Sequence, residues 1–258
     1  MNKVHYSLSA LLAVAVTASA QTITLWNFNT LDGNSTTGTT APAIGIGTAS
    51  LLGGTTATFA SGNAGTGSSD PETSTDDTAW NVSAFPGVTS GSGTAGALFA
   101  TSTVGYGKIA VSFDLRTSNT SSRYWQFQYT TDGSLFTPFG GNTVNGVDHV
   151  FTSAGGDMWN NGWTVDLSSV AAVDNNPNFA FRVVSIFSPV GFTQTTTPSA
   201  TYGPNEAYRA ANTDDRAYAT SGTARFDMVA VSQVPEPSVL ALVSTGLLGL
   251  LARRRRSA

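Results

Sequence analysis

The sequence predicts an all-β fold in which two antiparallel sheets pack face to face as a sandwich, with a jelly-roll-like topology. Apolar and polar residues alternate with a period of two, and this is the dominant pattern of the chain. The alternating segments are short, and turns rich in Gly, Asn and Asp separate them. Residues 21–234 contain no long segment with the 3.6-residue period of an amphipathic helix.

Four segments carry the clearest strand pattern. In 108–116 the large apolar side chains share one face of the expected strand. Residues 178–187 are almost all apolar, β-branched or aromatic, so they predict a central strand. The segments 124–129 and 223–231 also alternate, and Asp132-Gly133 predicts a hairpin turn after the first of them.

Shorter strands complete the expected sheets. They are 23–28, 55–59, 79–82, 97–100, 135–137, 147–151 and 163–167. The first of them is expected to lie beside the last strand of the body, as in many jelly rolls. Residues 168–173 predict one helical turn after a Ser cap. Long loops are expected at 32–50, 61–77 and 188–219.

The first 20 residues predict a secretory signal peptide. Lys3 supplies the positive charge, residues 8–20 are small or apolar, and Ala18-Ser19-Ala20 fits the small-residue rule for cleavage before Gln21. The folded body, expected at residues 21–234, is then exported by the secretion machinery. Its length suits a single all-β domain.

The C-terminal segment from Val234 has three parts in a fixed order. Two prolines flank a glutamate and break any helix that enters from the body. Residues 238–252 are uncharged and predict a membrane helix of about 22 Å, which is short for a bilayer core of about 30 Å. The arginine cluster that follows stays on the cytoplasmic side. The prolines, the glutamate and the arginines are Pro235, Glu236, Pro237, Arg253, Arg254, Arg255 and Arg256.

This order of parts resembles the PEP-CTERM sorting signal of Gram-negative bacteria. The resemblance covers residues 234–258 only. It implies that an exosortase, a membrane-embedded transpeptidase-like enzyme, recognises the tail and processes the protein near Pro235–Pro237. It also implies transient anchoring in the inner membrane, followed by delivery to the cell surface or to secreted exopolysaccharide. An ordinary C-terminal membrane anchor is the alternative, and it would leave the body on the same side of the membrane.

The body of the chain is acidic. Residues 21–234 contain 7 basic and 15 acidic side chains, so their formal net charge is −8. Because nucleic-acid binding depends on Lys and Arg contacts to phosphates, no nucleic-acid partner is expected. The chain contains no cysteine, which excludes disulfides, thiol nucleophiles and thiolate metal sites.

The sequence offers little catalytic chemistry. His149 is the only histidine of residues 21–234, and no nucleophile-elbow or zinc-binding motif accompanies it. The two glutamates of the body, Glu72 and Glu206, lie in expected loops. We therefore expect no enzyme, no catalytic residue and no organic cofactor.

Two binding sites are candidates. Trp159-Asn160-Asn161-Gly162-Trp163 reads as two aromatic residues flanking a turn, where exposed rings could stack on sugars and amides could bind hydroxyls. Packing of these tryptophans in the core is the alternative. A structural calcium ion could lie where the first and last strands meet, held by oxygens of Asn27, Asn29 and Asp227. The alternative is that Asp227 points to solvent.

These observations predict an exported cell-surface or exopolysaccharide-associated structural protein. A carbohydrate-binding module that is delivered to the surface in the same way is the alternative function.

Overall fold

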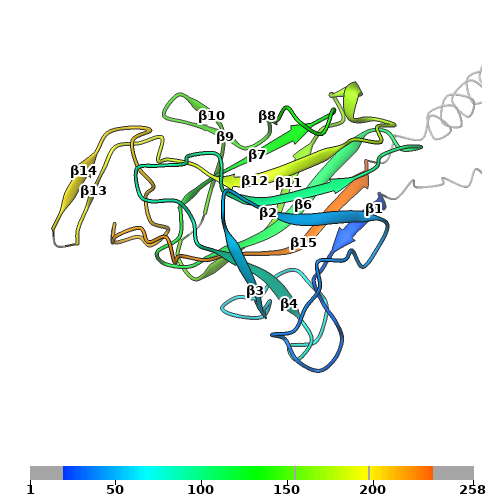
Figure 1. Ribbon diagram of the computed structural model, residues 1–258, viewed down its shortest axis with the longest axis horizontal. Coiled ribbons are helices and arrows are strands. Elements are labelled where there is room, and N and C mark those ends of the chain that lie inside the picture. Colours follow the sequence, from blue (N-terminus) through cyan, green and yellow to red (C-terminus); the bar gives the residue numbers. More distant parts are fainter. Residues whose placement is uncertain (1–19, 154, 197, 235–258) are drawn as a thin grey trace, which may run out of the picture. The chain divides into compact units, whose positions relative to one another are not determined.

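Strands dominate the structure, as the alternating sequence predicts (Figure 1). The computed structural model describes residues 20–153, 155–196 and 198–234. Residues 21–234 form one compact unit. In the described part of the chain, no helix is long and apolar enough to cross a membrane. The expected signal peptide, except for Ala20, and the expected apolar helix 238–252 lie outside the described residues.

The first sheet has six antiparallel strands. Its order is β11-β6-β15-β4-β3, and β1 also pairs with β15. The strands are β1 (Gln21–Trp26), β3 (Thr56–Ser61), β4 (Thr78–Ser83), β6 (Ile109–Thr117), β11 (Met158–Asp166) and β15 (Ala224–Gln233). The predicted pairing of the first and last strands is confirmed, with Trp26 opposite Val229 and Gln21 opposite Gln233.

The second sheet has seven strands. Its order is β2-β5-β12-β7-β10-β9, and β8 also pairs with β7. The strands are β2 (Gly47–Leu52), β5 (Gly96–Thr101), β7 (Tyr124–Thr130), β8 (Thr137–Pro138), β9 (Asn142–Val144), β10 (Val147–Thr152) and β12 (Ala180–Ser185). The prediction of a central strand in 178–187 is confirmed, because β12 lies between β5 and β7.

Aromatic side chains from both sheets fill the core between them. Phe226 of the first sheet contacts Phe99 and Trp125 of the second, with ring centroids 6.1 and 6.4 Å apart. The apolar face predicted for 108–116 is buried in this core. Because successive side chains of a strand point to opposite faces, the polar residues between them lie on the outer face of the first sheet.

Some elements differ from those that the sequence predicts. β2 begins inside the predicted loop 32–50. Its small residues form a strand because they pair with β5 at the edge of the sheet. The predicted loop 188–219 contains a hairpin of β13 (Phe192–Gln194) and β14 (Ala200–Tyr202), seen in yellow at the left of Figure 1. The predicted helical turn is η1 (Ala171–Val173), a 3-10 turn in which Val170, not a serine, holds the cap position.

Candidate functional site

A bulge in β15 lies where the strand changes its neighbour. Residues 224–226 pair with β4 and residues 229–233 pair with β1, so both neighbours lie along the edge of β15 opposite β6. The pairing with β6 is interrupted between Asp227 and Ala230. Met228 has a φ of 45°, and its N–H donates a hydrogen bond of 2.7 Å to Asp227 Oδ1. Since Phe226 is in the core, Asp227 projects from the outer face.

Three carboxylates meet at this bulge. Asp70, Asp77 and Asp227 each offer one oxygen, and these oxygens lie within 4.8 Å of one another. We call these three residues the carboxylate cluster. Asp77 directly precedes β4, and Asp70 lies in the segment between β3 and β4, residues 62–77, which we call the β3–β4 loop. The cluster therefore joins a loop to the strand at the centre of the first sheet.

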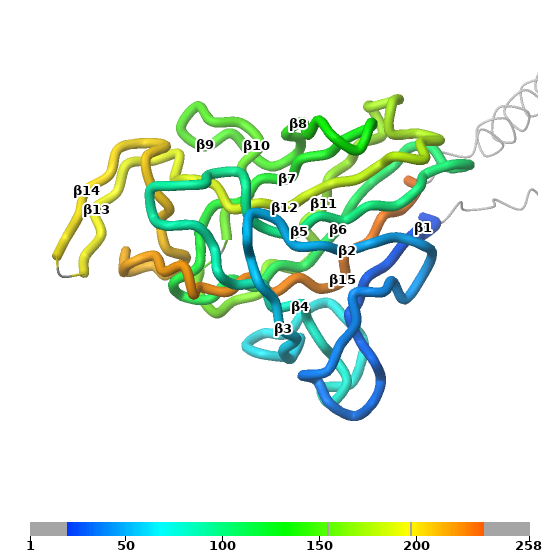
Figure 2. Tube along the Cα trace, viewed as in Figure 1, coloured from blue at the N-terminus to red at the C-terminus, as the bar shows by residue number. Residues whose placement is uncertain are grey.

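The segment that follows β1 reaches the same place. Asn29 donates from Nδ2 to Asp70 Oδ2 at 2.9 Å and accepts at Oδ1 from the Thr78 N–H at 2.7 Å. Gly33 N–H donates to Asp76 Oδ1. Figure 2 shows this blue segment beside the cyan β3–β4 loop in the lower part of the view. The polar network thus connects the segment after β1 to the start of β4, next to the bulge of β15.

Two carboxylates of the cluster are buried, and each has an oxygen without a hydrogen-bond partner. Asp227 is 0% exposed and Asp77 is 1% exposed, yet Asp227 Oδ2 and Asp77 Oδ1 have no hydrogen-bond partner. Burial raises the pKa of Asp77 to about 6, with a further contribution from the negative charge of Asp70. Burial and the charge of Asp77 also raise the pKa of Asp227 well above its ordinary value, although hydrogen bonds from Ser68 and Met228 oppose the rise. Burial raises the pKa of Asp70 as well.

No basic side chain compensates these charges among the described residues. The ion pairs found there, Arg116–Asp157, Arg209–Asp215 and Arg216–Asp214, do not include the carboxylate cluster. Arg225 is the basic residue of β15, and its guanidinium binds Asn81 Oδ1 and the Ser61 carbonyl instead. The site therefore gathers acidic groups in a buried position without a basic partner from the described residues.

The β3–β4 loop lies on the outer face of the first sheet. Asp114, which is opposite Asp227 in the β6–β15 register, accepts from Ser69 N–H at 2.5 Å and from Gly162 N–H at 2.6 Å. It thus links the loop to β11. Because the β3–β4 loop lies over this face, Asp114 is buried although it points away from the core between the sheets.

Two of the residues predicted to bind glycans help to hold this loop. Trp159 Nε1 donates to the Ala64 carbonyl at 2.9 Å, and Asn161 Nδ2 donates to the Gly67 carbonyl at 3.0 Å. Asn160 Nδ2 donates to the Leu115 carbonyl at 3.1 Å.

The five-residue segment is not the turn that the sequence suggested. It lies within β11, whose pairing with β6 shifts between Asn160 and Trp163. The expectation that Trp159 is exposed is wrong, because the loop covers its ring and leaves 6% of the residue exposed. Trp163 is half-buried and packs against Phe113 and Phe151. Glycan binding at this segment stays a prediction.

The structure brings together part of the predicted calcium site. Asp227 and Asn29 both belong to the network at the bulge, while Asn27 follows β1 directly and is half-buried. Sequence reasoning missed Asp70 and Asp77, because both lie in a Gly/Ser/Thr-rich loop where acidic residues are usually solvated. Their spacing from each other gives no metal-binding motif.

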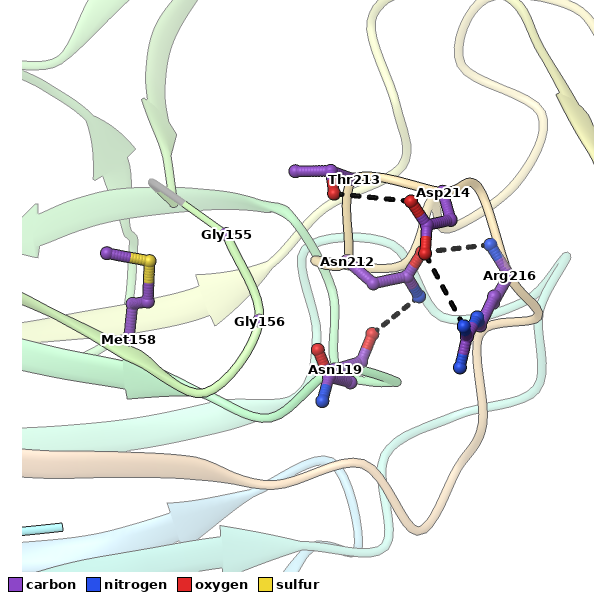
Figure 3. A pocket seen from close by; sticks show the side chains of 8 residues that line it. All are labelled: Asn119, Gly155, Gly156, Met158, Asn212, Thr213, Asp214 and Arg216. Atoms are coloured by element: carbon purple, nitrogen blue, oxygen red, sulfur yellow. Dashed lines mark hydrogen bonds and ion pairs between the residues drawn. The ribbon is translucent and has the colours of Figure 1, made fainter. Parts of the chain in front are cut away.

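Cavities lie elsewhere on the body. One, of about 360 Å³, is lined by Asn119, Gly155, Gly156, Met158, Asn212, Thr213, Asp214 and Arg216. Figure 3 shows its polar side chains bonded to one another, with Asn212 Nδ2 donating to the Asn119 carbonyl and Arg216 beside Asp214. A second cavity, of about 310 Å³, includes Trp163 and Asn142.

Comparison with known proteins identifies only the tail. Residues 233–256 match the PEP-CTERM protein-sorting motif. This confirms the resemblance seen in the sequence, and it covers Pro235, Glu236, Pro237 and the four arginines Arg253–Arg256, which lie outside the described residues. No curated protein matches the chain.

Proposed function

Because the chain carries a PEP-CTERM sorting motif at residues 233–256, we propose that it is an exported structural protein of the cell surface, associated with exopolysaccharide. In this proposal an N-terminal signal peptide directs export, and the apolar tail holds the protein in the inner membrane. An exosortase-type enzyme then processes it near Pro235–Pro237. The sorting motif is the single observation that carries the proposal.

The body of the chain supports this role. Residues 21–234 form sheets around a large aromatic core, which can keep an exported protein folded without disulfides. β15 ends at Gln233, so the sorting motif begins at the last residue of the folded sheet. The processing enzyme would therefore act just beyond the end of β15.

The sorting step can be tested in a Gram-negative host that carries an exosortase. Deletion of residues 235–258 should lower the amount of protein on the cell surface, and the double variant Pro235→Ala/Pro237→Ala should accumulate unprocessed in the membrane fraction. Ser257→Ala, next to the arginines and outside the matched motif, is the control and should be sorted normally. Unchanged surface levels after the deletion would contradict the proposal.

A carbohydrate-binding module is the second candidate, favoured by the position of Trp163. Trp163 is half-buried and lines the 310 Å³ cavity together with Phe151 and Asn142, so aromatic residues and an amide line the same cavity. Retention of the protein on exopolysaccharide should fall in Trp163→Ala. Leu135→Ala, which removes a side chain 75% exposed elsewhere on the surface, should leave retention unchanged. Equal retention of the wild type and Trp163→Ala would remove this candidate.

A further inference from the structure

We propose that the carboxylate cluster of Asp70, Asp77 and Asp227 binds a calcium ion, which ties the β3–β4 loop and the start of β4 to the bulge of β15. The proposal is independent of the sorting motif. It starts from the position of the three carboxylate oxygens, which lie within 4.8 Å of one another. At such distances one cation can contact all three oxygens at once.

A second observation points to a ligand. Asp227 is fully buried, and its Oδ2 has no hydrogen-bond partner. Asp77 Oδ1 is also buried without a partner. A buried polar atom without a partner is costly, and a buried charge without a partner is more so. A hydrogen bond from Met228 holds the other oxygen of Asp227, so Asp227 Oδ2 and Asp77 Oδ1 remain for a cation. Each Asp70 oxygen accepts one hydrogen bond and keeps a second lone pair for the same cation.

The backbone leaves space for these oxygens. A Cβ on Gly62 would lie 1.8 Å from Asp77 Oδ1 and 2.8 Å from Asp227 Oδ2. The backbone of Gly62 therefore passes beside the two unpartnered oxygens, and any side chain at this position would displace them. Gly62 N–H donates to the Asp77 carbonyl at 3.0 Å, which fixes the start and the end of the β3–β4 loop to each other.

The donor atoms select the metal. All three side chains offer carboxylate oxygens, and neither histidine nor cysteine belongs to the cluster, so a soft or borderline metal such as zinc is disfavoured. Mg²⁺ keeps several of its waters and demands near-octahedral geometry, whereas Ca²⁺ accepts six to eight oxygens in a flexible arrangement. A site with two carboxylates from the β3–β4 loop and one from β15 fits Ca²⁺ better.

Binding should be measured on the full chain in mild detergent after treatment with EDTA. Isothermal titration with CaCl₂ should give one saturable event, and 10 mM CaCl₂ should raise Tm by about 3–10 °C, as expected for a Kd of about 0.1–1 mM in an extracellular module. Titration with MgCl₂ should give a much weaker response. Absence of both the heat and the Tm shift with CaCl₂ would overturn the proposal, and an equal response to MgCl₂ would overturn the choice of metal.

Asp227→Asn is the decisive variant, because it is expected to fold. Its amide oxygen can still accept from Met228 N–H, and its nitrogen can donate to Asp77 Oδ1, so the metal-free protein loses a charge repulsion and gains a hydrogen bond. Its Tm in EDTA should therefore equal or exceed that of the wild type, while the Tm shift with CaCl₂ disappears. Asp148→Asn, at an exposed aspartate of β10, is the matched control and should keep the full shift. A wild-type calcium response in Asp227→Asn would refute the site.

Cleavage by a glutamate-specific protease localises the effect. Glu72 lies in the β3–β4 loop, two residues after Asp70, and Glu206 lies between β14 and β15. Calcium should slow cleavage at Glu72 several-fold in the wild type and leave cleavage at Glu206 unchanged. If calcium protects both glutamates equally, or protects neither, then no calcium ion holds this loop.

Discussion

Replacing Phe99 by alanine removes a side chain on which both sheets depend. Phe99 is fully buried in β5, and four aromatic rings surround it. Its ring centroid lies 5.2 Å from Trp26, 6.2 Å from Trp80 and 6.1 Å from Phe226, all in the first sheet. It also stacks on Phe181 of the neighbouring β12 at 5.2 Å. The variant therefore opens a cavity at the interface between the sheets.

The loss of stability can be estimated from these contacts. Truncation of a buried Phe to Ala costs about 3–5 kcal/mol. The four aromatic contacts place Phe99 at the upper end of this range. We therefore expect Phe99→Ala to lower the free energy of unfolding by about 5 kcal/mol. This is a large part of the 5–15 kcal/mol that is typical of a domain. The corresponding fall in Tm is about 10–20 °C.

Urea unfolding followed by tryptophan fluorescence measures this loss, since Trp26, Trp80 and Trp125 are all buried in the core. Phe136→Ala is the matched control. The ring of Phe136 is half-buried outside the core, where it lies 4.3 Å from the Arg182 guanidinium, so the control should cost about 1 kcal/mol. If Phe99→Ala costs no more than Phe136→Ala, the two sheets do not share the core described here.

Two further variants test the cover of the outer face. Asp114→Asn replaces one of the two carboxylate oxygens that accept from Ser69 and Gly162 N–H, so one partly buried hydrogen bond is lost; urea unfolding should show a loss of about 1–2 kcal/mol, and a loss below about 0.3 kcal/mol would contradict this role. Trp159→Phe keeps an aromatic ring but removes the hydrogen bond to the Ala64 carbonyl, so proteolysis of the β3–β4 loop should accelerate a few-fold while the Tm of the body changes little. An unchanged rate of proteolysis would show that this bond does not hold the loop.

The sequence predicts the strands well where their pattern is local. The alternation in 108–116 identifies both the strand and its core face, because its alternating apolar side chains are the ones that pack in the core between the sheets. The uniformly apolar pattern of 178–187 identifies a strand that has neighbours on both sides. These features depend only on the period of the side chains and on their polarity.

Features that depend on distant segments are not predictable in the same way. β2 contains mainly small residues and two leucines, so only its pairing with β5 makes it a strand. Trp159 reads as an exposed aromatic residue, because nothing near it in the sequence reveals that the β3–β4 loop covers it. Asp227 and Asn29 could be placed near each other from the expected pairing of the first and last strands. Asp70 and Asp77 could not, since the path of a Gly/Ser/Thr-rich loop is set by tertiary contacts.

The pairing of β1 with β15 also determines how the body would resist a pull on its C-terminus. Gln21 lies opposite Gln233, so the first and last strands of the body begin and finish at the same end of the first sheet. β15 is bonded to β6 on one side and to β1 and β4 on the other. A force along β15 is perpendicular to these bonds and loads them together in shear, instead of opening them one after another. A cell-surface protein attached through its C-terminus would thus meet mechanical load with the most extensively bonded strand of its sheet.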